Sequence, residues 1–224
     1  MNPLTEHDPQ QVHFVYNDPQ FESRSRAATA LRELGNAFVG HRTDDETLAA
    51  ITRWAKEATQ SLRSSAPVKR PTDYFEKRYT DPIPLDGQEV IAFSDRTFSG
   101  PANPMGMEIR LTRRDKSVVA SANFGSSFES APGRVHGGAI SAVVDDVMGY
   151  LMIVLGEAAY TAKLEVDYLG GVPVGETVWF HARESSRVGR KLSVELTVSL
   201  GPIDEFQATD PVITARGLFI IAKG

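Results

Sequence analysis

The sequence predicts an α+β fold in which a curved antiparallel sheet wraps round one central helix, with a helical extension before it. Two observations carry this prediction. Beyond residue 100, six stretches show the alternation of apolar and polar residues that is typical of half-buried strands. A single long helical stretch lies between the second and the third of them. This order of strand, strand, helix and four strands indicates an antiparallel sheet with one helix.

Residues 1–80 are expected to form a helical N-terminal extension. Its first helix can be capped by Ser23 or Ser25, and its apolar residues recur at helical spacing: Ala27, Leu31, Leu34 and Phe38. The second helix begins at Thr43 or Asp44 and runs to about Leu62. Its apolar stripe is Leu48, Ile51, Ala55, Ala58 and Leu62. Because two helices alone make a poor core, the extension is expected to pack on the larger domain.

The boundary between the extension and the main domain is placed after residue 80. Residues 1–80 hold eleven basic and eleven acidic side chains, whereas residues 81–224 hold thirteen basic and eighteen acidic ones. Two turn-rich stretches, 64–74 and 81–87, lie on either side of the boundary. The main domain therefore covers residues 81–224.

In the main domain, Met107, Ile109 and Leu111 alternate with polar residues, and residues 117–124 follow across a short turn, which predicts a hairpin. Four more strands are predicted at 162–169, 176–184, 191–200 and 211–222. The helical stretch at 139–155 is apolar on nearly all sides. Such a helix is expected to be enclosed by protein rather than to face solvent.

Composition excludes several classes of protein. The chain has 224 residues, no cysteine and a formal net charge of −5. Without cysteine there are no disulfides, Cys-ligated zinc sites, iron–sulfur clusters or thiol nucleophiles, and the histidines show no metal-ligand spacing. The negative charge argues against nucleic acid as a partner. No signal peptide is visible, and the longest apolar run, 147–155, is too short for a membrane span, so a cytoplasmic protein is expected.

One constellation of residues carries a family resemblance. His136, Gly137 and Gly138 open the apolar helix, Asp145 lies on it, and Thr161 begins the following strand. In this order and spacing they resemble the hot-dog-fold acyl-CoA thioesterases of the branch with an HGG…D…T pattern, over about residues 103–222. The resemblance implies a hot-dog fold, thioester hydrolysis and two-fold dimers. No metal or cofactor is expected besides the coenzyme A of the substrate.

The residue types fit that chemistry. The first N–H groups of a helix have no intrahelical partner, so the amides of Gly137 and Gly138 can stabilise a developing oxyanion. His136 can fix this loop by hydrogen bonding, or bind the substrate carbonyl. The resemblance implies that Asp145 is a general base or a nucleophile, and that the Thr161 hydroxyl positions the carboxylate or the attacking water.

Two points about the carboxylate and the hydroxyl stay open in the sequence. Asp146 competes with Asp145, but adjacent helical positions point about 100° apart, so only one should line the site. The motif favours Asp145 and leaves Asp146 a structural hydrogen bond. Strict alternation also places Thr161 on the face opposite Leu164 and Val166, unless the strand begins after Thr161.

The spacing along the helix predicts a dimer. Asp145 lies seven residues after Gly138, which is about 10 Å along a helix. One thioester cannot easily touch both. The site is therefore expected to join Asp145 of one subunit to the glycine amides of its partner, in a homodimer or in a tetramer built from such dimers.

The phosphates of coenzyme A need cations, and the turn at 183–193 is the candidate cofactor-binding segment. It places Arg187, Arg190 and Lys191 round Gly189, between two strands. A solvated hairpin tip with ordinary surface charges is the alternative interpretation.

The sequence therefore predicts a hydrolase of acyl-CoA thioesters, with a place in fatty acid metabolism. The alternative is a non-catalytic hot-dog module that binds acyl-CoA as a sensor or a regulatory partner. A hydratase or dehydratase is disfavoured by the placement of His136 and Asp145. The sequence has no phosphate-binding loop and no Gly-X-Ser-X-Gly elbow.

Overall fold

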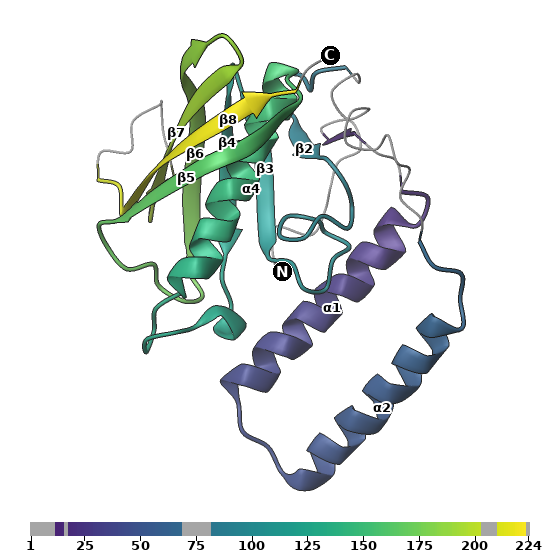
Figure 1. Cartoon of the computed structure of the whole chain (residues 1–224). Helices are drawn as coiled ribbons and strands as arrows, with labels where there is room; N and C mark the ends of the chain where they lie inside the picture. Colours follow the sequence, from purple (N-terminus) through teal and green to yellow (C-terminus); the bar gives the residue numbers. More distant parts are fainter. Residues whose placement is uncertain (1–11, 16–17, 69–81, 203–209, 223–224) are drawn as a thin grey trace.

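A computed structural model describes residues 12–15, 18–68, 82–202 and 210–222. All six strands predicted from alternation are present (Figure 1). They are β3 (Glu108–Arg114), β4 (Ser117–Asn123), β5 (Ala159–Tyr168), β6 (Thr177–Val188), β7 (Lys191–Ser199) and β8 (Ile213–Ile221). The sequence therefore predicts the existence of each of these six strands correctly, and their ends to within a few residues.

The sheet holds two further short strands, β1 (Val12–Phe14) and β2 (Glu89–Ile91). The eight strands follow the order β1-β2-β3-β4-β6-β7-β8-β5. Every neighbouring pair is antiparallel except β1 and β2, so the sheet is mixed rather than purely antiparallel. Because β1 comes from the N-terminal extension, the sheet crosses the predicted boundary, and the extension is not purely helical.

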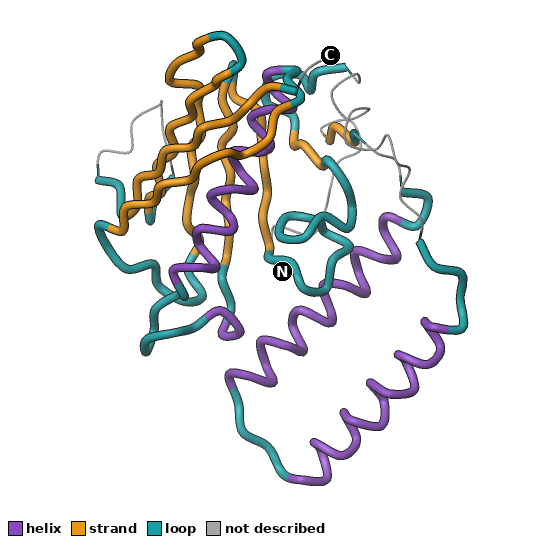
Figure 2. The backbone as a smooth tube through the Cα atoms, in the orientation of Figure 1, coloured by secondary structure: helices purple, strands orange, loops and turns teal. Residues whose placement is uncertain are grey.

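The central helix α4 (Gly137–Leu155) runs along one face of the sheet (Figures 1 and 2) and contacts strands β3 to β8. Eleven of its residues are buried. The helix ends at Gly156, whose φ of 67° lies in the left-handed region that favours glycine at a helix C-terminus. The prediction of a helix enclosed by protein is confirmed, and α4 forms the centre of the hydrophobic core.

By length and composition alone, α4 is also apolar enough to cross a membrane. Its most apolar 18-residue window has a mean hydropathy of 1.7, and 61% of that window is buried inside the fold. The core helix of a soluble protein has the same composition, so this property is weak evidence for a membrane span. The expectation that no segment is long enough was too strict, because it counted only an unbroken apolar run.

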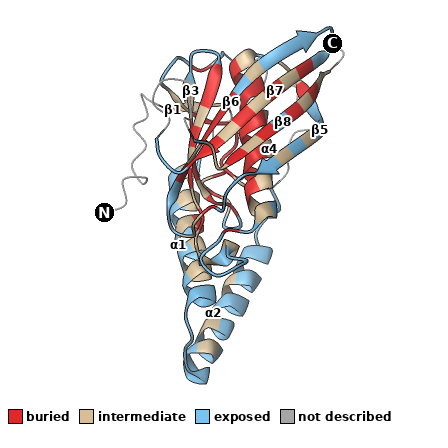
Figure 3. Cartoon of the chain, turned by 90° about the vertical axis from the view of Figure 1, so that its left-hand side faces the viewer, coloured by how far each residue is buried: buried red, intermediate tan, exposed pale blue. Residues whose placement is uncertain are grey.

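The extension forms two long helices, α1 (Phe21–Gly40) and α2 (Asp45–Arg63), which lie beside the sheet domain (Figure 1). Asp44 caps α2 as predicted, with its side chain accepting a hydrogen bond from the Thr47 N–H. The predicted serine cap of α1 is wrong, since the helix begins earlier and its N-cap Gln20 makes no side-chain cap bond. No residue of α2 is buried, and Figure 3 shows it as a largely exposed helix.

The face by which α1 packs on the main domain is polar, not apolar. Of the residues in α1, only Ala28 is buried, while Leu31 and Phe38 of the predicted stripe stay exposed. Arg32 instead donates hydrogen bonds to the carbonyls of Pro101 and Asn103. Hydrogen bonds to loop carbonyls therefore help to hold α1 on the main domain, and the apolar stripe is a poor guide to which side of α1 is covered.

Candidate active site

The imidazole of His136 caps the start of α4. Its Nδ1 accepts a hydrogen bond of 2.9 Å from the Gly138 N–H. The His136 carbonyl accepts the next two amides, those of Ala139 and Ile140. This hydrogen bond fits the first of the two roles predicted for His136, which is to fix the loop. A ring nitrogen can accept this bond only when it carries no proton.

One amide remains available at the helix start, and it belongs to Gly137. Among the residues that the structure describes, the Gly137 N–H has no hydrogen-bond partner. The Gly138 N–H points into the histidine cap instead. The sequence assigned oxyanion binding to both glycines. The geometry leaves only the Gly137 amide available for such a role, because the histidine cap uses the amide of Gly138.

Tyr168, which sequence reasoning missed, holds the same turn from the other side. Its hydroxyl donates to the Gly137 carbonyl at 2.9 Å and also contacts the Ser141 hydroxyl. A Cβ at Gly137 would lie 3.3 Å from the Tyr168 ring, so a larger residue would crowd this contact. The peptide group between Gly137 and Gly138 is therefore hydrogen-bonded on both sides. Tyr168 binds its carbonyl, and His136 accepts from its N–H. Nothing in the strand pattern distinguishes Tyr168 from an ordinary strand residue.

Asp145 and Thr161 come together as the motif predicts. The Thr161 hydroxyl donates a hydrogen bond of 2.9 Å to Oδ1 of Asp145. Asp145 is half-buried on α4, and Thr161 is exposed on β5. The second carboxylate oxygen, Oδ2, stays available to accept a proton, so the pair has the form of a positioned general base.

A bulge in β5 explains how Thr161 reaches the helix. The pairing of β5 with β8 shifts register between Thr161 and Lys163. An extra residue in a strand reverses the alternation of its side chains. Thr161 therefore shares the inner face with Leu164 and Val166, which pack against the core. The sequence left open that the strand begins after Thr161. The strand in fact begins before it, at Ala159, and the bulge accounts for the orientation of Thr161 instead.

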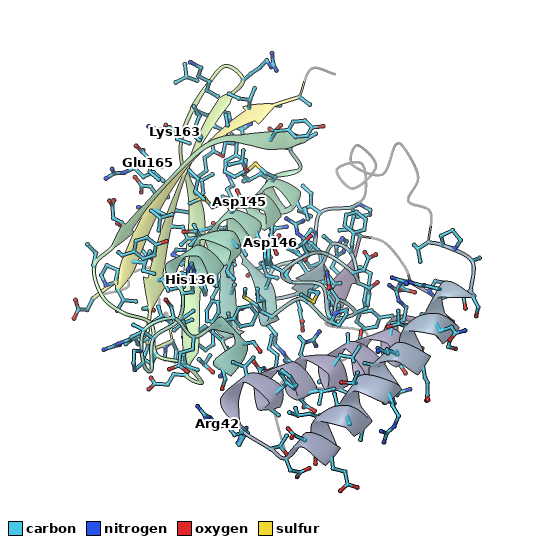
Figure 4. The ribbon with its side chains drawn as sticks, turned by 60° about the horizontal axis from the view of Figure 1, so that its bottom comes forward. Arg42, His136, Asp145, Asp146, Lys163 and Glu165 are labelled. Atoms are coloured by element: carbon cyan, nitrogen blue, oxygen red, sulfur yellow. The ribbon has the colours of Figure 1, made fainter. Side chains whose placement is uncertain are left out.

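Asp146 lies apart from this pair, although it is adjacent in the chain (Figure 4). Its side chain is buried at 6% exposure and forms an ion pair with Arg96, which comes from the loop between β2 and β3. The expectation that Asp146 makes a structural hydrogen bond is met. Asp146 cannot serve as the base while it is enclosed and paired in this way.

The candidate coenzyme A turn joins β6 to β7, with Gly189 at a φ of 57°. Arg187 forms ion pairs with Glu184 and Glu157, and these hydrogen bonds raise the pKa of its guanidinium. Arg190 donates to a backbone carbonyl, that of Ile221, and Lys191 is exposed. Two carboxylates thus neutralise Arg187, which weakens the prediction that it holds a phosphate.

The edge of the sheet next to this site is open. β5 pairs with β8 on one side and is the last strand in the order. Most of its side chains are exposed (Figure 3). Gly137 lies eight residues before Asp145 on one straight helix, which separates them by about 12 Å. Within one chain, the free amide and the carboxylate therefore lie too far apart to act on one carbonyl group.

Comparisons with known proteins agree with this geometry. The Thioesterase superfamily profile matches residues 132–205, a segment that includes the helix start, Asp145 and Thr161. The acyl-coenzyme A thioesterase THEM4 of Rattus norvegicus is 31% identical over 96 residues, which are 42% of this chain and 41% of the rat protein. The chain thus matches less than half of the length of that relative.

Two other relatives cover more of the chain. An uncharacterized mitochondrial protein of Candida albicans (strain WO-1) is 23% identical over 167 residues, 69% of this chain and 74% of the yeast protein. A crystal structure of a thioesterase superfamily protein superposes with a TM-score of 0.71 at 22% identity, covering 88% of this chain and 90% of that one. The second likeness establishes the fold.

This molecule has the hot-dog fold, in which an antiparallel sheet wraps round one long helix. The matched segment makes the assignment more specific. Residues 132–205, the segment that holds the helix start, Asp145 and Thr161, are similar to the thioesterase superfamily.

Proposed function

We propose that this protein hydrolyses acyl-CoA thioesters to a free acid and coenzyme A. The observation that carries the proposal is the hydrogen bond from Thr161 to Asp145, because it orients a half-buried carboxylate and leaves its second oxygen to act as a base. The unpaired amide of Gly137 supports it from the other end of the helix. The name of the THEM4 relative supports acyl-CoA as the substrate class.

In the proposed reaction, Asp145 removes a proton from a water molecule as the water oxygen attacks the thioester carbonyl carbon. The carbonyl oxygen becomes an oxyanion, which the Gly137 N–H and the positive end of the helix stabilise. The C–S bond then breaks, and the thiolate of coenzyme A takes up the proton. Direct attack by Asp145 would form a mixed anhydride that water then hydrolyses. Both routes need an ionised Asp145 held by Thr161.

The site is proposed to be complete only in a homodimer. The separation of Gly137 from Asp145 and the exposed edge of β5 both favour a two-fold arrangement in which β5 strands of two copies meet. Each dimer then has two equivalent sites, and a tetramer could form from two such dimers. Light scattering after size exclusion should give the mass of a dimer, and an active monomer would exclude this arrangement.

Coenzyme A is proposed to bind through Lys191 and Arg190 rather than Arg187. Lys191 is exposed on the turn, whereas the charge of Arg187 is already neutralised. Lys191→Met should raise KM for an acyl-CoA by about tenfold, since one phosphate contact of this kind is worth roughly 1–2 kcal/mol. Arg187→Met serves as the matched control. An equal rise in KM for both variants would contradict the ranking.

The activity is tested by release of free thiol from a panel of acyl-CoAs. Wild type should turn over at least one member, and Asp145→Asn should lower kcat by about 10²- to 10⁴-fold with an unchanged fold. Asp146→Asn is not a neutral control, because it breaks a buried ion pair. Asp45→Asn, on the exposed helix α2, is the neutral control. Binding of acyl-CoA without turnover of any substrate would favour the non-catalytic module instead.

A further inference from the structure

An arginine of the loop between β2 and β3, Arg96, packs on one face of α4. Asp146, Gly149 and Tyr150 lie on this face, since residues three and four apart on a helix are neighbours. Arg96 forms an ion pair with Asp146 through Nε, and its guanidinium lies 4.6 Å from the centroid of the Tyr150 ring. A Cβ at Gly149 would come within 2.9 Å of the Arg96 guanidinium. The Arg96 side chain therefore lies against Asp146, Gly149 and Tyr150 of the helix at the same time.

Asp146 depends on this arginine. One of its carboxylate oxygens accepts from Arg96, and the other, Oδ2, is buried with no hydrogen-bond partner among the described residues. An unpaired charge in such a position costs several kcal/mol. Without Arg96, α4 would gain by turning Asp146 toward solvent. Such a rotation acts on the adjacent residue, Asp145.

The loop that presents Arg96 is itself held by the N-terminal extension. Arg32 of α1 donates hydrogen bonds of 3.0 and 2.8 Å to the carbonyls of Pro101 and Asn103. Asn103 in turn donates through its side-chain amide to the Arg96 carbonyl at 3.3 Å. The hydroxyl of Ser99, from the same loop, donates to Tyr150 at 3.1 Å. A continuous set of contacts thus joins α1 to the helix that carries Asp145.

We propose that Arg96 is a positioning residue for the reaction, and that through its loop the extension fixes the rotation of α4 so that Asp145 faces Thr161. This inference rests on the proposed function. Asp145 and Asp146 point about 100° apart, so holding Asp146 by Arg96 sets the direction of Asp145. The extension then has a role that needs no contact with substrate: it locks the catalytic helix in register with β5.

Arg96→Met in the full-length protein tests this role, with Arg96→Lys as the conservative variant. The methionine variant should lower kcat by about 10²-fold with KM nearly unchanged, because a small misplacement of a catalytic group costs that much. Arg96→Lys should recover part of kcat. Arg113→Met is the matched control, since Arg113 binds backbone carbonyls of a turn away from α4. It should leave kcat within about twofold.

The double variant Arg96→Met/Asp146→Asn separates positioning from stability. It removes the unpaired charge, so its melting temperature should recover relative to Arg96→Met, while kcat stays low. Recovery of kcat together with the melting temperature would overturn the proposal. Arg96 would then affect activity only through the fraction of protein that is folded, not through the orientation of Asp145.

A crystal structure of the double variant gives a readout that does not depend on activity. The distance from Thr161 Oγ1 to Asp145 Oδ1, 2.9 Å in the native arrangement, should exceed hydrogen-bonding range. An unchanged distance would overturn the proposal even if kcat fell. An inactive wild type would overturn the proposed hydrolysis, while this distance would still decide the role of Arg96.

Discussion

The helices α4 and α2 both contain 19 residues, and both are amphipathic or apolar enough to be predicted from sequence, yet they lie in opposite surroundings. Eleven residues of α4 are buried, whereas α2 buries none (Figure 3). The difference shows that periodicity predicts a helix but not what covers it. The helix that carries Asp145 is the one that the sheet encloses, and close packing on several sides fixes the direction of its side chains.

The largest expected effect compares one leucine from each helix. Leu151 of α4 is fully buried, and Leu62 of α2 is 75% exposed. Leu151→Ala should lower the free energy of unfolding by about 2–5 kcal/mol, because it leaves a cavity in a packed core. Leu62→Ala should change it by less than about 0.5 kcal/mol. Urea denaturation measures both, and similar losses would show that α2 is covered in solution.

The next effect concerns the hydroxyl that orients the carboxylate on α4. Thr161→Val keeps the shape of the side chain and removes its hydrogen bond to Asp145. A hydrogen bond to a charged group contributes roughly 1.5–3 kcal/mol, so kcat should fall by about 10- to 100-fold. Thr214→Val on β8 is the control for a similar change on a strand. If Thr161→Val kept its full kcat, Thr161 would have no part in the reaction.

A smaller effect is expected at the start of α4. Tyr168→Phe keeps the ring against Gly137 but removes the hydrogen bond to its carbonyl. One neutral hydrogen bond contributes about 0.5–1.5 kcal/mol, so kcat should fall by roughly 2- to 10-fold. Steady-state kinetics measures the loss. A kcat equal to that of wild type would show that the Tyr168 hydroxyl has no part in the reaction.

The smallest effect is local to α2. Its cap Asp44 accepts from the Thr47 N–H, and this hydrogen bond lowers the pKa of Asp44. A carboxyl whose pKa falls on folding stabilises the helix above its unfolded pKa, and the contribution is lost as the pH drops through the lower folded value. Acidification below about pH 4 should therefore fray α2.

Circular dichroism should show the loss of helix for Asp44→Ala already at neutral pH, and Asp45→Ala, at the first helical position, is the matched control. Because α2 buries nothing, the sheet domain should keep its melting temperature in both variants. Cooperative unfolding of the whole chain on loss of the cap would contradict the independence of α2.

What the sequence reveals about this fold depends on the length of each pattern. β3 to β8 and α4 span enough residues for their periodicity to be recognised. β1 and β2 have three residues each, too few for any period, and only the neighbouring strands define them. The apolar spacing of α1 does not reveal how this helix docks, because Arg32 and Asn36 make hydrogen bonds to the main domain that no periodicity indicates.

The site divides in the same way. The motif located Asp145, Thr161 and the helix start, because their order in the chain is part of the pattern. It could not show that His136 uses the Gly138 amide, since this depends on a side-chain rotamer. Arg96 and Tyr168 escaped notice because they reach the site through tertiary contacts over 50 and 31 residues of chain.

The bulge in β5 has a consequence for how such a protein can change over generations. Deleting the one residue Ala162, which lies within the register shift, would leave Thr161 two positions before Leu164, so regular alternation would keep both side chains on the inner face. The core face of Leu164 and Val166 and the open sheet edge would remain as they are. The loss of this one codon would thus keep the Thr161–Asp145 hydrogen bond on which the proposed hydrolysis rests, so the length of β5 can change at the bulge without loss of the pair.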